Sequence, residues 1–108
     1  MKETFGEFLK NLRVENEMTL TQLGAKLGID SGALSKIENN KRKLDEKILP
    51  KIAKVFKLNL DKLKDEFISE QIAYKVYENN CTNNVLKLAE EKIEYIKQRN
   101  YKQGSLDL

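Results

Sequence analysis

Histidine and tryptophan are absent from this chain of 108 residues, and cysteine and proline occur only once each. The lack of histidine removes the commonest general base of enzymes, and no metal-ligand spacing is present. We therefore expect no enzyme, no metal and no cofactor. The lone cysteine, Cys81, excludes an internal disulfide and is interpreted as an inert residue. With only Pro50 and five glycines to interrupt helices, and no long β-rich segment, the composition favours an all-α fold.

Long apolar runs are also missing from the sequence. No stretch approaches the roughly 20 apolar residues of a membrane-spanning helix. The N-terminal residues, MKETFGEFLK, lack the apolar segment of a signal peptide. Together with the single cysteine, these absences predict a cytoplasmic protein with no membrane partner.

The net charge of +3 is distributed unevenly along the chain. Residues 1–64 carry 14 Lys/Arg against 9 Asp/Glu, whereas residues 65–108 carry 6 against 8. A basic N-terminal half fits an anionic partner such as nucleic acid, and it equally fits a lysine-rich solvated surface. Charge alone does not decide between these two interpretations.

Apolar residues recur at helical spacing along most of the chain. The pattern predicts helices over residues 5–15, 20–28, 31–38, 46–56, 60–78 and 85–98, with a basic loop at 39–43 and a polar break at 79–84. We expect a five-helix domain over residues 1–66, followed by one or two additional C-terminal helices. Residues 67–98 then form a helical extension for packing or dimerisation, and residues 99–108 form a flexible tail.

Signals at the helix ends support these boundaries. Thr4 and Glu7, and again Thr19 and Gln22, have the spacing of a capping box, in which two side chains satisfy free backbone N–H groups. Gly28 predicts a helix end in the left-handed conformation.

Two residues are unusual within the predicted helices. Gly24 costs about 1 kcal/mol relative to alanine, so we expect a close helix–helix contact that excludes a larger side chain. Pro50 lies inside the start of its helix, and we expect it to bend or tighten the first turn.

The most informative stretch is TLTQLGAKLGIDSGALSKIE, residues 19–38. It predicts two short helices separated by a tight glycine turn. In the second helix Ala33, Leu34 and Ile37 point inward, which leaves small polar groups and one lysine outside: Ser31, Gly32, Ser35 and Lys36. A helix with this outer face is suited to the major groove of double-stranded DNA.

The chain from Phe5 to Leu63 resembles the phage-repressor/Cro type of helix-turn-helix domain, known as the XRE family. The matching pieces are LTQLGAKLGI, SKIENNK, and KIAKVF followed by LNLDKL. The resemblance implies a repressor-like five-helix globule that binds DNA as a dimer. It also implies a phosphate contact for Thr19 and base reading by Ser31, Gly32, Ser35 and Lys36. Asn39, Asn40 and Lys41 would contact the DNA backbone, and Arg13 and Glu38 would form a salt bridge.

The chemistry of these residues fits such roles. Lys36 can donate to guanine O6 or N7, while Ser31 and Ser35 can donate or accept. The basic residues Lys41, Arg42 and Lys43 can neutralise phosphates and so set affinity. Each has an alternative as an ordinary surface residue. Gly32 lacks a side chain where relatives often read a base, which shifts part of the specificity to few groups or to DNA shape.

The C-terminal helices carry a second apolar pattern. Leu86, Ala89, Ile93 and Ile96 have the spacing of a coiled-coil seam. We expect these residues, with Phe67, Ile72 and Val76, to pack the extension or a dimer interface. The segment QIAYKVYENNCTNNVLKLAEEKIEYI is also distantly similar to controllers of restriction–modification systems.

The resulting hypothesis is a sequence-specific transcriptional regulator of double-stranded DNA, a homodimeric repressor or autoregulator that reads a palindromic operator. Its half-sites would lie about 34 Å apart. The alternative is an antitoxin or another protein-interaction module, in which the C-terminal helices bind a partner protein and DNA binding is secondary.

Overall fold

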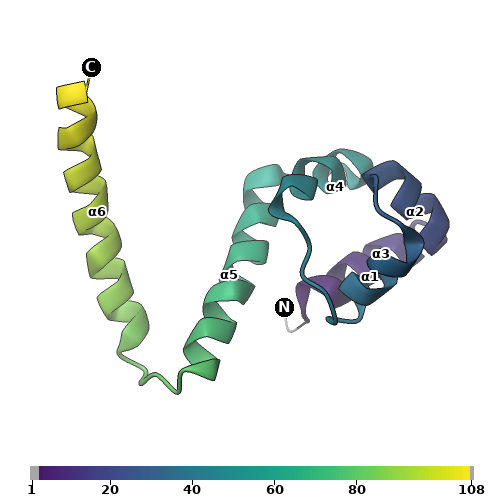
Figure 1. Cartoon of the computed structure of the whole chain (residues 1–108), viewed down its shortest axis with the longest axis horizontal. Coiled ribbons are helices and arrows are strands. Elements are labelled where there is room, and N and C mark those ends of the chain that lie inside the picture. The colour runs from purple at the N-terminus through teal and green to yellow at the C-terminus, as the bar shows by residue number, and fades with distance from the viewer. Residues whose placement is uncertain (1–2, 108) are drawn as a thin grey trace. The chain divides into compact units, whose positions relative to one another are not determined.

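The computed structural model describes residues 3–107, and the side chains of residues 3–100. The described residues form the helices α1 (Phe5–Glu15), α2 (Leu20–Leu27), α3 (Ser31–Glu38), η1 (Glu46–Ile48), α4 (Leu49–Phe56), α5 (Leu60–Glu78) and α6 (Val85–Asp107), of which η1 is a 3-10 helix (Figure 1). No strand occurs among them, which confirms the predicted all-α fold. They divide into two compact units, one ending at Ile72 and the other starting at Ala73.

The first unit has a closed apolar core. Its largest fully buried side chains come from α1, α2, α3 and α4: Leu9, Leu23, Leu27, Leu34, Leu49 and Ile52. The N-terminal half of α5 adds Leu63 and Phe67 to this core. Phe67 meets Phe5 edge to face at a centroid distance of 5.2 Å. In addition, the Phe5 N–H donates to the Glu70 carboxylate at 3.0 Å, so α5 is tied to the first turn of α1.

The helix starts are as the sequence predicts. In each of the two capping boxes, at Thr4 and at Thr19, the threonine Oγ1 accepts a 3.0 Å bond from the backbone N–H of the third residue after it. That third residue, Glu7 or Gln22, returns a side-chain oxygen to the threonine N–H. The hydrogen bond from the Thr4 backbone holds the pKa of Glu7 below its ordinary value, and the Thr4 side chain adds to the effect.

Each helix from α1 to α5 ends in the same way. A residue with positive φ follows the helix, and the next N–H donates back to a carbonyl of the last turn, as from Met18 to Arg13 and from Cys81 to Val76. Gly28 is one such residue, as predicted. The others are Glu17, Asn40, Lys57 and Asn80.

Two positions show where the backbones approach most closely. A Cβ on Gly6 would lie 2.3 Å from the Ile37 carbonyl oxygen, so the first turn of α1 packs directly against the end of α3. A Cβ on Gly24 would lie 2.4 Å from the Ile29 carbonyl. The close contact expected at Gly24 is therefore present, but it is made with the turn that follows α2 and not with another helix. Pro50 lies in the first turn of α4, where its missing N–H costs little, directly after the tighter 3-10 turn of η1.

One residue and one helix end differ from the prediction. Phe67, which was expected to pack the extension or a dimer interface, belongs to the core of the first unit, which ends at Ile72. The helix expected to end at Gln98 continues to Asp107. Residues 101–107 are thus helical in backbone, while residue 108 of the predicted flexible tail lies outside the described residues.

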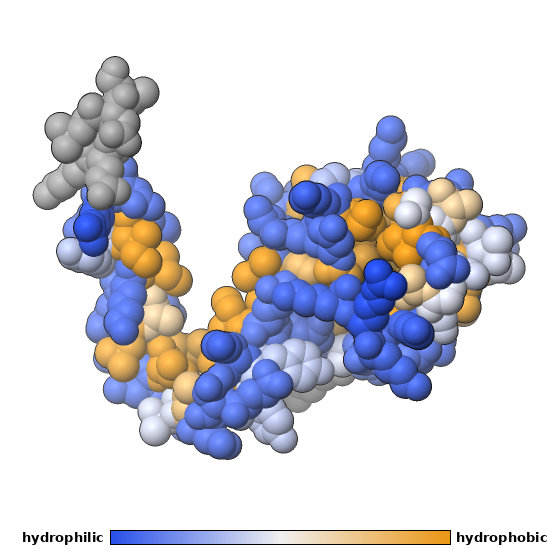
Figure 2. All heavy atoms as spheres, in the orientation of Figure 1, coloured by the Kyte–Doolittle hydropathy of each residue, from blue (hydrophilic) through white to orange (hydrophobic). Residues whose placement is uncertain are grey.

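The second unit has little buried surface of its own. Its large apolar side chains are mostly exposed, among them Leu86, Leu88, Ile93, Tyr95 and Ile96 on α6. Figure 2 shows hydrophobic residues gathered along this helix. Ala89 and Val76 are partly buried. Among the described helices, none is both long and apolar enough to span a membrane.

Candidate nucleic-acid interface

The turn between α2 and α3 fixes how α3 is presented. Gly28 adopts φ 72°, and the Ile29 N–H donates to the Gly24 carbonyl at 2.8 Å. Asp30 then caps α3, because its two carboxylate oxygens accept from the N–H groups of Gly32 and Ala33 at 3.2 Å each. The chain reverses within a few residues, and α3 is left with one face against the core.

The outer face of α3 has the polarity that the sequence predicts. Ala33, Leu34, Ile37 and Glu38 are buried. Gly32 and Lys36 are exposed, and Ser31 and Ser35 are half-buried. The four predicted base-reading residues therefore share one surface, which carries two hydroxyl groups, one ammonium group and a bare backbone at Gly32.

Thr19 lies exposed at the N-terminus of α2. Its oxygen is used as an acceptor in the capping box, but the hydroxyl proton is still available to donate. Gln22 uses its Oε1 in the same box, which leaves its NH2 group as a second donor at this helix end. Both groups can donate to a phosphate.

The basic loop after α3 is anchored at both ends. At its start Asn40 adopts φ 62°, and the Lys41 N–H donates to the Lys36 carbonyl at 2.8 Å. At its end Leu44 is buried with only 4% of its surface exposed. The exposed side chains of Lys41, Arg42 and Lys43 lie between these anchors. Asn39 is less free than expected, because its Nδ2 donates to the Ser35 carbonyl at 2.8 Å.

A family model described as helix-turn-helix matches residues 9–63, which is more than half of the chain. The chain belongs to the helix-turn-helix family. The XRE type inferred from the sequence motifs is thereby confirmed, and the matched residues run from Leu9 in α1 to Leu63 in α5.

One curated relative and several solved structures are similar to this helix-turn-helix chain. It is 35% identical over 83 residues to the HTH-type transcriptional repressor RghR of Bacillus subtilis (strain 168). That alignment covers 73% of this chain and 62% of RghR, so the chain spans less than two thirds of the length of that relative.

Among solved structures, the chain is similar to SinR, the master regulator for biofilm formation, in complex with DNA. The identity is 28% and the TM-score 0.50, over 57% of this chain and all of that one. A SinR–SinI protein complex matches 91% of this chain and 99% of that chain at 24% identity and a TM-score of 0.50. A hypothetical protein from E. coli matches 90% of this chain and 99% of that chain at 24% identity and a TM-score of 0.57. The last two likenesses concern the fold alone.

Within the helix-turn-helix domain, Arg13 and Glu38 form the expected ion pair. The Arg13 Nε and Nη2 donate to the two Glu38 carboxylate oxygens at 2.8 and 3.0 Å. The third guanidinium nitrogen, Nη1, donates to the Met18 carbonyl at 2.8 Å. Glu38 is only 3% exposed and Arg13 12%, so the pair ties the ends of α1 and α3 together in a dry environment.

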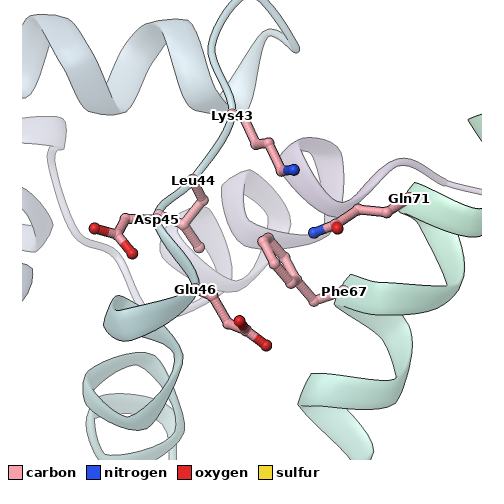
Figure 3. A pocket seen from close by; sticks show the side chains of 6 residues that line it. All are labelled: Lys43, Leu44, Asp45, Glu46, Phe67 and Gln71. Carbon is pink, nitrogen blue, oxygen red and sulfur yellow. The ribbon is translucent and has the colours of Figure 1, made fainter.

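A hollow of about 360 Å³ lies between the end of the basic loop and α5 (Figure 3). Lys43, Leu44 and Glu46 reach into it from the loop and η1, and Phe67 and Gln71 reach into it from α5. The Asp45 carboxylate points away from the other side chains. Leu44 and Phe67 form its apolar floor, so α5 supports the loop that carries the three basic residues.

Sequence reasoning missed several residues that shape this interface. Gln22 was read only as a helix cap, although its NH2 group is a free donor. Leu44 anchors the basic loop, and a lone leucine directly after a run of charges is the signal that could have revealed it. Gly6 sets the distance between α1 and α3, but a single glycine in a helix does not reveal its neighbour.

Proposed function

We propose that this chain is a sequence-specific regulator of transcription that binds double-stranded DNA as a homodimer and acts as a repressor or autoregulator. Helix α3 enters the major groove, and α2 faces the backbone with its N-terminus. Ser31, Ser35 and Lys36 read base edges, while Thr19 and the basic loop contact phosphates.

The observation that carries the proposal is the polar outer face of α3, in a domain that also offers phosphate donors at the start of α2 and in the loop after α3. The Thr19 hydroxyl lies at the N-terminus of α2, and Lys41, Arg42 and Lys43 lie beyond the C-terminus of α3. Base-reading groups flanked by backbone-binding groups are what a recognition helix requires. The similarity to RghR and to DNA-bound SinR supports the same function.

Selection of bound DNA from a random pool tests the proposal directly. The expected product is a palindrome whose half-sites are about one helical turn apart, near 34 Å. Recovery of unrelated sequences with no common site would contradict sequence-specific binding. Recovery of a single, unrepeated half-site would contradict the dimer while leaving DNA binding intact.

Two sets of variants then separate base reading from backbone binding. The pair Ser35→Ala and Lys36→Ala should lower the preference for the selected site, at about 1–3 kcal/mol per good contact. The pair Lys41→Ala and Arg42→Ala should weaken binding to all sequences and reduce the salt dependence by about one unit of slope per lost phosphate contact. Lys92→Ala, on the exposed surface of α6, is the matched control and should alter neither property. If the first pair leaves site preference intact, the assignment of the groove face is wrong.

The dimer is proposed to form through α5 and α6. Ile72, Leu86, Ile93 and Ile96 are each about half exposed, and burial of such side chains contributes about 25 cal/mol per Å² of apolar surface. Sedimentation at micromolar concentration should give a dimer, with and without DNA. The double variant Ile93→Asp and Ile96→Asp should be monomeric with an intact first unit. A wild-type monomer under both conditions would overturn this part.

A protein-binding role, as in an antitoxin, is the second candidate, and the same exposed apolar residues favour it. Here α6 would bind a different protein and not a second copy. Co-purification of a stoichiometric partner that is lost in the Ile93→Asp variant would support this candidate. A stable homodimer with no such partner would exclude it.

A further inference from the structure

We infer that Asp30 is a base-reading residue that accepts a hydrogen bond from a cytosine amino group, and that Gly32 keeps its carboxylate accessible. This inference rests on the proposed function, because it requires α3 to enter the major groove. It adds a residue at the leading end of the helix that neither the sequence motifs nor the family resemblance assigned to DNA.

The carboxylate of Asp30 is held in one place by the helix that it caps. Its Oδ1 accepts from the Gly32 N–H and its Oδ2 from the Ala33 N–H, both at 3.2 Å. Each carboxylate oxygen can accept a second hydrogen bond. Asp30 is exposed, and among the described side chains no lysine or arginine forms a salt bridge with it. The structure thus presents a fixed and unneutralised pair of acceptors at the N-terminus of α3.

Capping by itself does not require an aspartate at this position. Serine and asparagine cap helices about as well, and both are neutral. The helix dipole stabilises an aspartate somewhat more than a neutral cap. Beside DNA, however, the phosphates repel its negative charge, since the duplex carries one phosphate charge for about every 1.7 Å of axis. A carboxylate is favoured there over a neutral cap when a base donates to it.

The pattern of groups in the major groove selects the base. Guanine presents two acceptors, and thymine presents an acceptor and a methyl group, so neither can donate to a carboxylate. Adenine presents an N6 donor, but the neighbouring N7 acceptor repels the second carboxylate oxygen of Asp30. Cytosine presents its N4 amino group alone and is the base that Asp and Glu pair with in this groove.

Gly32 leaves this acceptor pair uncovered. A Cβ at residue 32 would lie 3.5 and 3.8 Å from the two Asp30 carboxylate oxygens and would meet no other group within 4 Å. The position therefore has room for a side chain, and any side chain there starts directly beside the carboxylate. Gly32 therefore offers no base-reading side chain of its own, but it leaves the Asp30 carboxylate exposed.

The experiment selects bound DNA from a random pool with the full chain and two variants, Asp30→Ser and Asp30→Asn. Both substitutions keep a helix cap, and circular dichroism checks that each variant folds. Asp45→Ser is the matched control, because Asp45 is also an exposed capping aspartate, accepting from the Lys47 N–H at 3.0 Å, but at η1 rather than at α3. The wild type should select cytosine at one position in each half-site, by about tenfold over the other bases.

The outcomes are distinct. The inference is supported when Asp30→Ser loses the cytosine preference at that one position and Asp30→Asn, whose amide donates, moves it to a base with an acceptor. Asp45→Ser should raise affinity through its lost charge and keep the cytosine. If Asp30→Ser and the wild type select the same base at every position, Asp30 is only a cap. A wild type that selects no site overturns the proposed function, and this inference with it.

Discussion

The two units of this chain use apolar residues in opposite ways. In the first unit six large aliphatic side chains from four helices are almost fully buried against one another. In the second unit seven large apolar side chains between Tyr74 and Ile96 expose between 46% and 79% of their surface. The first unit is therefore stabilised from within, whereas the second still has apolar surface available for burial. The contrast separates a helix-turn-helix domain with its own core from an extension whose apolar residues remain exposed.

The largest expected difference between the units is in the stability lost when one aliphatic side chain of each is truncated. Leu9→Ala should destabilise the protein by about 2 to 5 kcal/mol, because it leaves a cavity in a closed core. Ile93→Ala removes a half-exposed side chain and should cost under about 1 kcal/mol in a monomer. Chemical unfolding at several protein concentrations provides the comparison. A large, concentration-dependent loss for Ile93→Ala would mean that the second unit is buried in an oligomer.

The next effect concerns the buried ion pair of the first unit. Arg13→Met leaves the Glu38 carboxylate without its main partner, which costs about 3 to 5 kcal/mol for fully buried pairs. We expect about 2 to 3 kcal/mol here, because Arg13 keeps some contact with water. Lys97 and Glu94 on α6 form an exposed pair, so Lys97→Met should have almost no effect. Equal losses for the two variants would refute the contrast between the units.

Two glycines of the first unit should respond to alanine with opposite signs. Gly6→Ala places a Cβ against the Ile37 carbonyl and should destabilise by about 1 to 3 kcal/mol, since a backbone atom must move. Gly32→Ala meets only ordinary contacts and should stabilise α3 by about 0.5 to 1 kcal/mol. Thermal melting of both variants decides the point. A neutral Gly6→Ala would show that α1 and α3 pack less rigidly than described.

The smallest effect is a pH dependence at the start of α1. The pKa of Glu7 is lowered by hydrogen bonds from Thr4, so its carboxylate form is favoured in the folded state. Its contribution is present above the ordinary value of 4.5 and is lost as the pH falls through the lower folded pKa. Glu7→Gln should remove this part of the acid sensitivity. The box at Thr19 uses the neutral Gln22 and should show none, as NMR titration of the two helix starts can verify.

The helices of the first unit were predictable because their signals are local. Thr4, Thr19, Asp30 and Gly28 each act within a few residues of their own position, so the chain around them is sufficient to recognise the helix end. The outer face of α3 followed from the same periodicity. The motif at residues 19–38 therefore located α3 and its outer face correctly.

The features that were missed depend on contacts distant in sequence. Phe67 joins the core through Phe5, which lies near the other end of the unit's sequence. Glu70 accepts from the Phe5 N–H for the same reason. Left-handed helix ends at Glu17 and Lys57 were missed because neither residue favours that conformation. No local pattern carries this information.

Those left-handed helix ends have a consequence for how the sequence can change. At Glu17 and Lys57 a residue with a Cβ holds a backbone conformation that glycine adopts without strain. A reserve of stability therefore exists at two exposed helix ends. One glycine at either position can therefore offset a destabilising substitution elsewhere in the chain, for example in α3. The two turns thus determine in part how much destabilisation the rest of the chain tolerates.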